Sequence, residues 1–197
     1  MHNTLEFPEV LRLIEDRSAA FRAAIASAPD LDVQVPACPD WTLREAGPDR
    51  GCWTWWGRSQ APQTSGAVAR HQIQELAVHT YDVQSTLGAA QPLPADVAVE
   101  GVDEFLTTVS ATTVPWPFKP ATIDLHATEG GSWRLTLNAD GVHCDDLAAD
   151  AEPGDLAMRG AASEMVLYFY ARIPFDGLET TGDTEPMEQL ADWDPTA

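Results

Sequence analysis

The sequence predicts an α+β fold, with a helical first half and a second half that mixes strands and helices. Two stretches of the first half place apolar residues at three- and four-residue steps, the spacing of one helix face. In the second half, apolar and polar residues alternate over two neighbouring stretches, as in strands with one buried face. Pro92 and Pro94 separate the halves, so we expect domains at residues 1–90 and 91–197.

The chain is expected to begin with a helix and an extended connector. The helix spans Phe7–Ser27 and is stopped by Pro29. Residues 33–41 are extended, because each proline among them disfavours helix in the residue before it. Asp40 can then cap a short turn over residues 42–45.

A tryptophan-bearing loop and a second helix complete the first half. Residues 47–66 are rich in glycine and proline, which predicts a loop, and they include Trp53, Trp55 and Trp56. The helix follows over Ala67–Leu87 and ends at Gly88. Its apolar face is expected to comprise Ile73, Leu76, Thr80, Val83 and Leu87.

In the second half, a helix from Ala95 towards Val109 precedes the strands. Residues 122–128 and 132–138 alternate around a glycine turn, which predicts a hairpin. Further expected elements are strands at 142–144 and 155–159 and a helix at 161–172. The acidic, proline-marked end, residues 180–197, is expected to fray after Gly182 and Asp183.

Composition excludes several classes of protein. A formal net charge of −20 makes nucleic acid and anionic membranes poor partners. No apolar run approaches the roughly 18 to 20 residues of a bilayer-spanning helix, and the start of the chain lacks the pattern of a signal peptide, so we expect a cytoplasmic protein. Cys38, Cys52 and Cys144 are widely spaced, which indicates reduced thiols rather than a disulfide framework or a cysteine zinc site.

The second helix carries candidate metal ligands at four-residue steps, namely His71, Glu75 and His79. The outer two are separated by about 12 Å along a helix, so only an adjacent pair can share an ion. Glu75 and His79 lie closer to the apolar face than His71 does, which makes them the better pair. The alternative is a hydrogen bond between Glu75 and His79 on the flank of the helix, with His71 in solvent.

Several motifs resemble those of the mycothiol-dependent maleylpyruvate isomerases, and together they cover nearly the whole chain. They are Val35–Glu45, Trp53–Gly57, Glu75–Asp82, Pro92–Asp96, Gly101–Leu106, Leu125–Thr128 and Arg159–Ser163. The resemblance implies a DinB-like helical domain at residues 1–90, packed on a small sterol-carrier-like α/β domain at 91–197.

The resemblance also implies a chemistry. In the family a divalent metal, usually zinc, is held by one histidine on an earlier helix and by a Glu and a His that match Glu75 and His79. A thiol cofactor, mycothiol, binds the metal as thiolate, adds to a conjugated double bond, permits rotation and leaves. Arg172 resembles a family arginine associated with carboxylates of the substrate or cofactor, although a cation near a helix C-terminus explains it equally well.

The chain departs from the family pattern after Glu45. Two of the four bundle helices are missing, and with them the first metal histidine. Asp49 falls near that position and is the candidate replacement ligand. The remaining two helices cannot cover each other's apolar faces as a four-helix core does, so we expect a homodimer in which two helices from each chain rebuild the bundle.

Two functions are compatible with these observations. One is a metal-dependent, thiol-assisted isomerase or transferase for a small unsaturated acid, with Glu75, His79 and Asp49 on the metal and Arg172 on a carboxylate. The other is a metal-free protein that binds a small molecule, has a structural role, or acts as an enzyme through the cavity between its halves.

Overall fold

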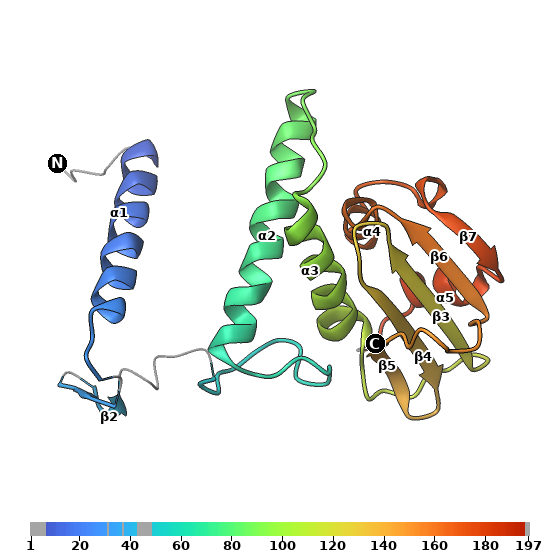
Figure 1. Ribbon diagram of the computed structural model, residues 1–197, viewed down its shortest axis with the longest axis horizontal. Helices are drawn as coiled ribbons and strands as arrows, with labels where there is room; N and C mark the ends of the chain where they lie inside the picture. Colours follow the sequence, from blue (N-terminus) through green and yellow to red (C-terminus); the bar gives the residue numbers. More distant parts are fainter. Residues whose placement is uncertain (1–6, 31, 37, 43–48, 196–197) are drawn as a thin grey trace. The chain divides into compact units, whose positions relative to one another are not determined.

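The computed structural model describes residues 7–30, 32–36, 38–42 and 49–195 of the chain (Figure 1). It divides into two compact units, Met1–Arg50 and Gly51–Ala197. Helices together with a five-stranded mixed sheet confirm the predicted α+β class. The boundary expected between residues 90 and 91 falls inside the second unit, where α2 contacts α3.

The first unit contains one helix and one short hairpin. Helix α1 spans Phe7–Ala26, as its periodicity predicts. The connector expected to be merely extended folds back on itself, because strand β1 (Gln34–Val35) pairs antiparallel with β2 (Cys38–Thr42). The turn predicted at residues 42–45 lies outside the described residues, apart from Thr42 at the end of β2.

The second unit starts with an irregular segment, residues 51–64, that carries the three tryptophans. The side chain of Gln60 extends the sheet at its edge like a short strand, since its amide donates to the Cys144 carbonyl at 3.0 Å and accepts from the Cys144 N–H at 2.5 Å. Trp56 is buried, whereas Trp53 is 83% exposed. The predicted loop is confirmed over residues 51–64, while residues 47 and 48 lie outside the described residues and 65–66 begin α2. Gln60 attaches the loop to the sheet.

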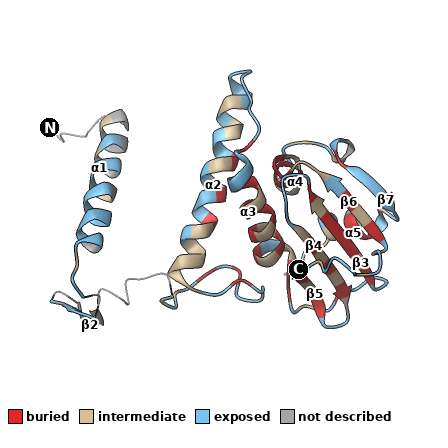
Figure 2. Ribbon diagram, viewed as in Figure 1, coloured by how far each residue is buried: buried red, intermediate tan, exposed pale blue. Residues whose placement is uncertain are grey.

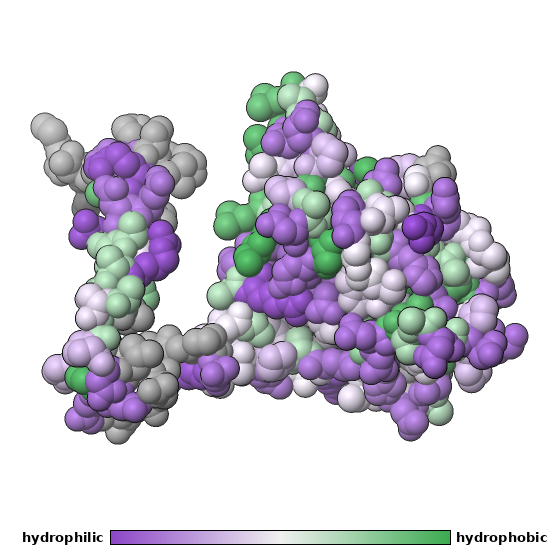
Figure 3. Space-filling model, in the orientation of Figure 1, coloured by the Kyte–Doolittle hydropathy of each residue, from purple (hydrophilic) through white to green (hydrophobic). Residues whose placement is uncertain are grey.

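Helix α2 spans Ser65–Thr86. Thr64 is its N-cap, and the Thr64 hydroxyl accepts a hydrogen bond from the Ala67 N–H. The expected apolar face of this helix is the wrong one. Leu76 is 72% exposed, whereas His71, Gln74 and Val78 form the buried side. In Figure 3, hydrophobic side chains are accordingly seen on the outer surface of α2. The exposed members of the predicted face are Ile73, Leu76, Thr80, Val83 and Leu87.

Helix α3 (Ala95–Phe105) packs beside α2 and continues as the π-helical turn η1 (Leu106–Ser110), close to the predicted end at Val109. Two features join the helices. A Cβ at Gly101 would collide with the side-chain amide of Gln74, so the glycine allows α3 to approach α2 closely. The Arg70 guanidinium on α2 binds the carboxylates of Glu100 and Asp103 on α3.

The sheet has the strand order β5-β4-β3-β6-β7. Its strands are β3 (Ala121–Ala127), β4 (Ser132–Asn138), β5 (Gly141–Asp146), β6 (Leu156–Gly160) and β7 (Glu179–Gly182). Only β3 and β6 pair in parallel, and β3 and β4 form the predicted hairpin, with Ile123 opposite Leu135. The alternate burial along β4 confirms one buried face.

Helices α3, α4 (Ala162–Phe169) and α5 (Glu185–Asp192) contribute side chains to the same core cluster as the sheet (Figure 2). The prediction that the chain frays after Gly182 is wrong. Met187 of α5 is buried, and Trp193 meets Trp116 edge to face at a centroid distance of 5.1 Å. These few apolar residues fix an otherwise acidic segment.

Cys52 and Cys144 are free thiols, in agreement with the prediction. Burial raises the pKa of the Cys144 thiol to about 12, which keeps it protonated at neutral pH. Among the helices of the described residues, none combines the length and apolarity needed to cross a bilayer.

Candidate functional site

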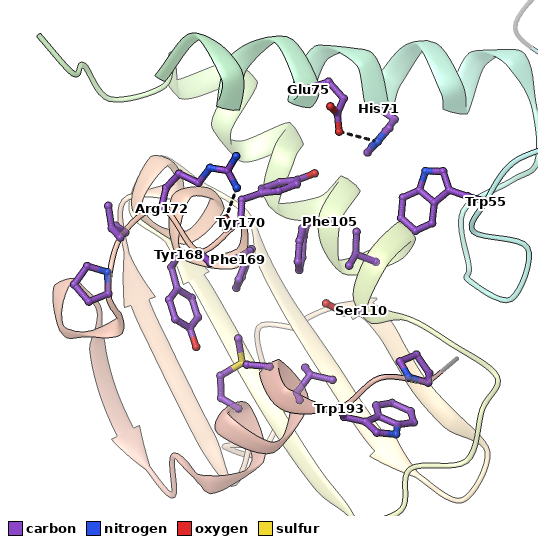
Figure 4. A pocket seen from close by; sticks show the side chains of 18 residues that line it. Trp55, His71, Glu75, Phe105, Ser110, Tyr168, Phe169, Tyr170, Arg172 and Trp193 are labelled. Atoms are coloured by element: carbon purple, nitrogen blue, oxygen red, sulfur yellow. Dashed lines mark hydrogen bonds and ion pairs between the residues drawn. The ribbon is translucent and has the colours of Figure 1, made fainter. Parts of the chain in front are cut away.

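The second unit contains a cavity of about 1040 Å³, which we call the α2–α4 cavity (Figure 4). Its walls come from α2, the Trp55 loop, the end of α3 with η1, the end of α4 and the C-terminal segment around α5. Figure 4 shows His71 and Glu75 reaching into it from α2, with Arg172 entering from the turn after α4. The cavity therefore gathers residues from both halves of the sequence.

His71 is held on both sides by carboxylates. Its Nδ1 lies 3.0 Å from Oε1 of Glu104, which is 1% exposed, and its Nε2 lies 3.2 Å from Oε1 of Glu75. The ring also contacts Trp55 and Trp56 edge to face, at centroid distances of 5.7 and 5.6 Å. A solvated His71, which was one alternative from the sequence, is therefore wrong, since α3 and the tryptophan loop enclose it.

Glu75 and His79 are brought together as the sequence predicts. Oε2 of Glu75 lies 3.3 Å from Nε2 of His79, whose Nδ1 lies 3.0 Å from a carboxylate oxygen of Asp82. Glu75 therefore sits between two histidines, with one carboxylate oxygen towards each. His79 is exposed and does not line the cavity, whereas Glu75 does.

The residues present fit a metal ion only in part. A carboxylate on Nδ1 of a histidine, as Asp82 provides for His79, is the usual support for a ligand that binds through Nε2. A protein zinc site needs at least three side-chain ligands, however, and no such group of His, Cys, Asp or Glu exists among the residues that the structure describes. Asp49, the predicted third ligand, is exposed and stays a prediction. Within the second unit, the candidate donors are Glu75 and His79.

Arg172 forms a bidentate ion pair. Its Nε and one terminal nitrogen donate to the two oxygens of Asp82 at 2.9 and 2.8 Å, and the other terminal nitrogen donates to the Tyr170 carbonyl at 2.6 Å. This pairing holds the pKa of Asp82 well below its usual range, mainly through the Arg172 hydrogen bond. A guanidinium has five N–H groups, so these three bonds leave two for a ligand in the cavity.

The direction of Arg172 is set by the end of α4. The Ala171 N–H donates to the Tyr168 carbonyl at 2.8 Å and the Arg172 N–H to the Leu167 carbonyl at 2.7 Å, the two bonds of a Schellman motif. The motif places Ala171 at a positive φ of 58°. Because the chain reverses direction here, Arg172 lies beside Asp82 of α2. The interpretation of Arg172 as a cation at a helix C-terminus explains its bond to the Tyr170 carbonyl but not its ion pair with Asp82.

Three features of the site were missed from the sequence: the burial of His71, its partner Glu104, and Tyr170. Oε2 of Glu104 and the Tyr170 hydroxyl are buried without a hydrogen-bond partner among the described residues. Burial, reinforced by the charge of Glu104, raises the pKa of Tyr170 and keeps its hydroxyl protonated. A glutamate directly beside the apolar residues Val102, Phe105 and Leu106 was the available signal for a buried carboxylate.

Two family models match the chain. The mycothiol maleylpyruvate isomerase N-terminal domain matches residues 42–84, which include His71, Glu75 and His79. The MDMPI C-terminal domain matches residues 96–189, which include Glu104 and Arg172. No curated protein matches the chain.

Solved structures resemble the chain only weakly. They include the stereoselective inverting sec-alkylsulfatase Pisa1 from Pseudomonas sp., at 9% identity and a TM-score of 0.33 over 39% of this chain. The chain covers only 14% of that enzyme. The ubiquinone synthesis protein UbiJ-SCP2 matches over 64% of this chain and 96% of its own, at 12% identity and a TM-score of 0.27.

The solved structures therefore carry no argument about function, whereas the two family models do. They match adjoining regions in the order expected of one protein, and they meet at the α2–α4 cavity. The chain belongs to the mycothiol maleylpyruvate isomerase family.

Proposed function

We propose that this protein is a thiol-assisted isomerase or transferase that acts on a small unsaturated acid in the α2–α4 cavity. The observation that supports this most is the polar end of the cavity, which is lined by His71, Glu75 and Arg172. The region matched by the N-terminal model supplies the first two and the region matched by the C-terminal model supplies the arginine. Both domains of the family thus contribute to a single site.

The proposed reaction requires no net proton transfer. A thiolate, from mycothiol or a similar cofactor, adds to one carbon of the double bond, and the electron pair of that bond moves into the conjugated carbonyl group. Rotation about the resulting single bond follows. The electron pair then returns, re-forms the double bond and expels the thiolate. Transfer results instead if the intermediate takes up a proton and keeps the sulfur.

Arg172 has the central task in this scheme. Its two remaining N–H groups bind the carboxylate of the acid, and the Asp82 pair keeps the guanidinium in place while the rest of the acid rotates. The mostly apolar walls exclude water from the intermediate. Because the candidate metal donors among the described residues of the second unit are two, Glu75 and His79, no step is assigned to a metal.

A second candidate function uses the same cavity without a thiol. What favours it is that the described residues hold no group of three or more His, Cys, Asp or Glu, since a family member without a complete metal site can remain a small-molecule binding protein. The two candidates differ in one respect: a binding protein retains the acid unchanged in the presence of a thiol.

Replacing Arg172 tests the proposed site. Arg172→Gln removes the charge that holds the carboxylate, so we expect kcat/KM for thiol-dependent isomerisation of an unsaturated monocarboxylic acid such as cis-cinnamate to fall at least about tenfold. Arg159→Gln is the matched control, because Arg159 is an exposed arginine outside the cavity. Circular dichroism checks that both variants are folded. Equal activity of Arg172→Gln and the wild-type protein would show that the carboxylate binds elsewhere.

A further inference from the structure

The walls of the α2–α4 cavity are far more aromatic than a small dicarboxylic acid requires. Six aromatic side chains line it: Trp55, Phe105, Tyr168, Phe169, Tyr170 and Trp193. Its volume of about 1040 Å³ lies at the upper end of the range for drug-sized ligands. A ligand as small and polar as maleylpyruvate would leave most of this apolar surface in contact with water.

The aromatic side chains form a connected wall. Phe105 stacks on Phe169 at a centroid distance of 4.9 Å and an interplanar angle of 17°, and it meets Tyr170 edge to face at 5.1 Å. Figure 4 shows these rings next to Arg172, with Trp193 at the opposite side of the cavity. A flat ring bound here has both faces and edges of other rings to contact, the arrangements that aromatic pairs prefer.

The charged groups, by contrast, are few and close together. Among the described lining residues, Arg172 is the one Lys or Arg and Glu75 the one carboxylate, and both lie at the α2 end. Both ring nitrogens of His71 already face carboxylates, so the cavity offers an anion one attachment point, the Arg172 guanidinium. A ligand with one carboxylate and one apolar body matches this distribution of charge.

From these observations we propose that the unsaturated acid of this protein is an aryl-substituted monocarboxylic acid, with the carboxylate on Arg172 and the ring against Phe105 and Phe169. This inference takes the site from the proposed function and names its substrate class. The double bond would then lie between the two anchored ends, where Figure 4 shows Tyr170.

Binding of three acids to the wild-type protein, measured by isothermal titration calorimetry without any thiol, tests the proposal. The probes are trans-cinnamate, trans-2-nonenoate, which has the same number of carbon atoms but no ring, and fumarate, a small diacid. We expect cinnamate to bind at least about tenfold more tightly than fumarate and at least about threefold more tightly than nonenoate. Equal or weaker binding of cinnamate in either comparison overturns the proposal.

A substitution locates the ring. Phe105→Leu keeps an apolar side chain but removes the aromatic face, so we expect this variant to bind cinnamate no more tightly than nonenoate. Phe118→Leu, at an exposed phenylalanine outside the cavity, should leave the advantage intact. If Phe105→Leu does not fold, the three-acid comparison still decides. Because no thiol is present, a failure of this binding order is distinct from a failure of thiol-dependent turnover.

Discussion

Ala171 shows how a single residue shapes the site. It occupies the left-handed region at a φ of 58°, where a Cβ crowds the following carbonyl oxygen and where helix ends usually place glycine. The end of α2 has the same Schellman motif with the usual residue, Gly88 at a φ of 69°. The two helix ends therefore have the same backbone geometry. They differ at the left-handed position, which is alanine beside Arg172 and glycine at the end of α2.

We expect reciprocal substitutions at these positions to have opposite effects on stability. Ala171→Gly relieves the left-handed strain and should raise the free energy of unfolding by about 1 kcal/mol. Gly88→Ala introduces the same strain and should lower it by about 1 kcal/mol, since an added Cβ there meets no atom within 4 Å. Urea denaturation measures both. Changes of the same sign would refute the proposed origin of the strain.

At the scale of elements, local patterns predicted the α-helices other than α5 and the β3–β4 hairpin, because spacing along the chain determines them. The pairing of Ile123 with Leu135 follows from alternation and the glycine turn. The buried side of α2 did not follow from its pattern, because that side depends on its neighbours. Polar His71 and Gln74 are buried because Glu104 and Gly101 of α3 accommodate them.

The site itself was predictable only where its residues are neighbours in sequence. Glu75 and His79 are one helical turn apart, so their contact could be expected. The contacts of Glu104 with His71 and of Arg172 with Asp82 join residues 33 and 90 positions apart, and the packing of α3 and α4 determines them. Helix α5 was missed because Met187 and Leu190 are sparse among acidic residues.

At the scale of the whole molecule, the outer face of α2 is largely uncovered by the described residues of the second unit. Leu76 is 72% and Leu87 75% exposed, and with Ile73 and Val83 they form an apolar stripe that only Thr80 interrupts. Such a stripe on a helix is usually buried against other helices. The described part of the tryptophan loop contains no helix where the family has two more, so we expect a second copy of the chain to supply the cover.

The homodimer is tested by its mass in solution. Light scattering after size exclusion should give twice the chain mass of 21.4 kDa. Leu76→Glu places a charge in the proposed interface and should shift the protein to the monomer. Gln72→Glu, which adds the same charge at another exposed position of α2, should leave the dimer intact. A monomeric wild-type protein at all concentrations would rule out the dimer.

The most direct test of the account is the dependence of the reaction on a thiol. The initial rates of isomerisation of maleylpyruvate and of cis-cinnamate by the wild-type protein would be measured over a range of mycothiol concentrations and without any thiol. We predict a rate with cis-cinnamate that rises with mycothiol to saturation and is absent without it. A rate that is unaffected by mycothiol, or no turnover of either acid at any mycothiol concentration, would contradict the proposed thiol-assisted reaction.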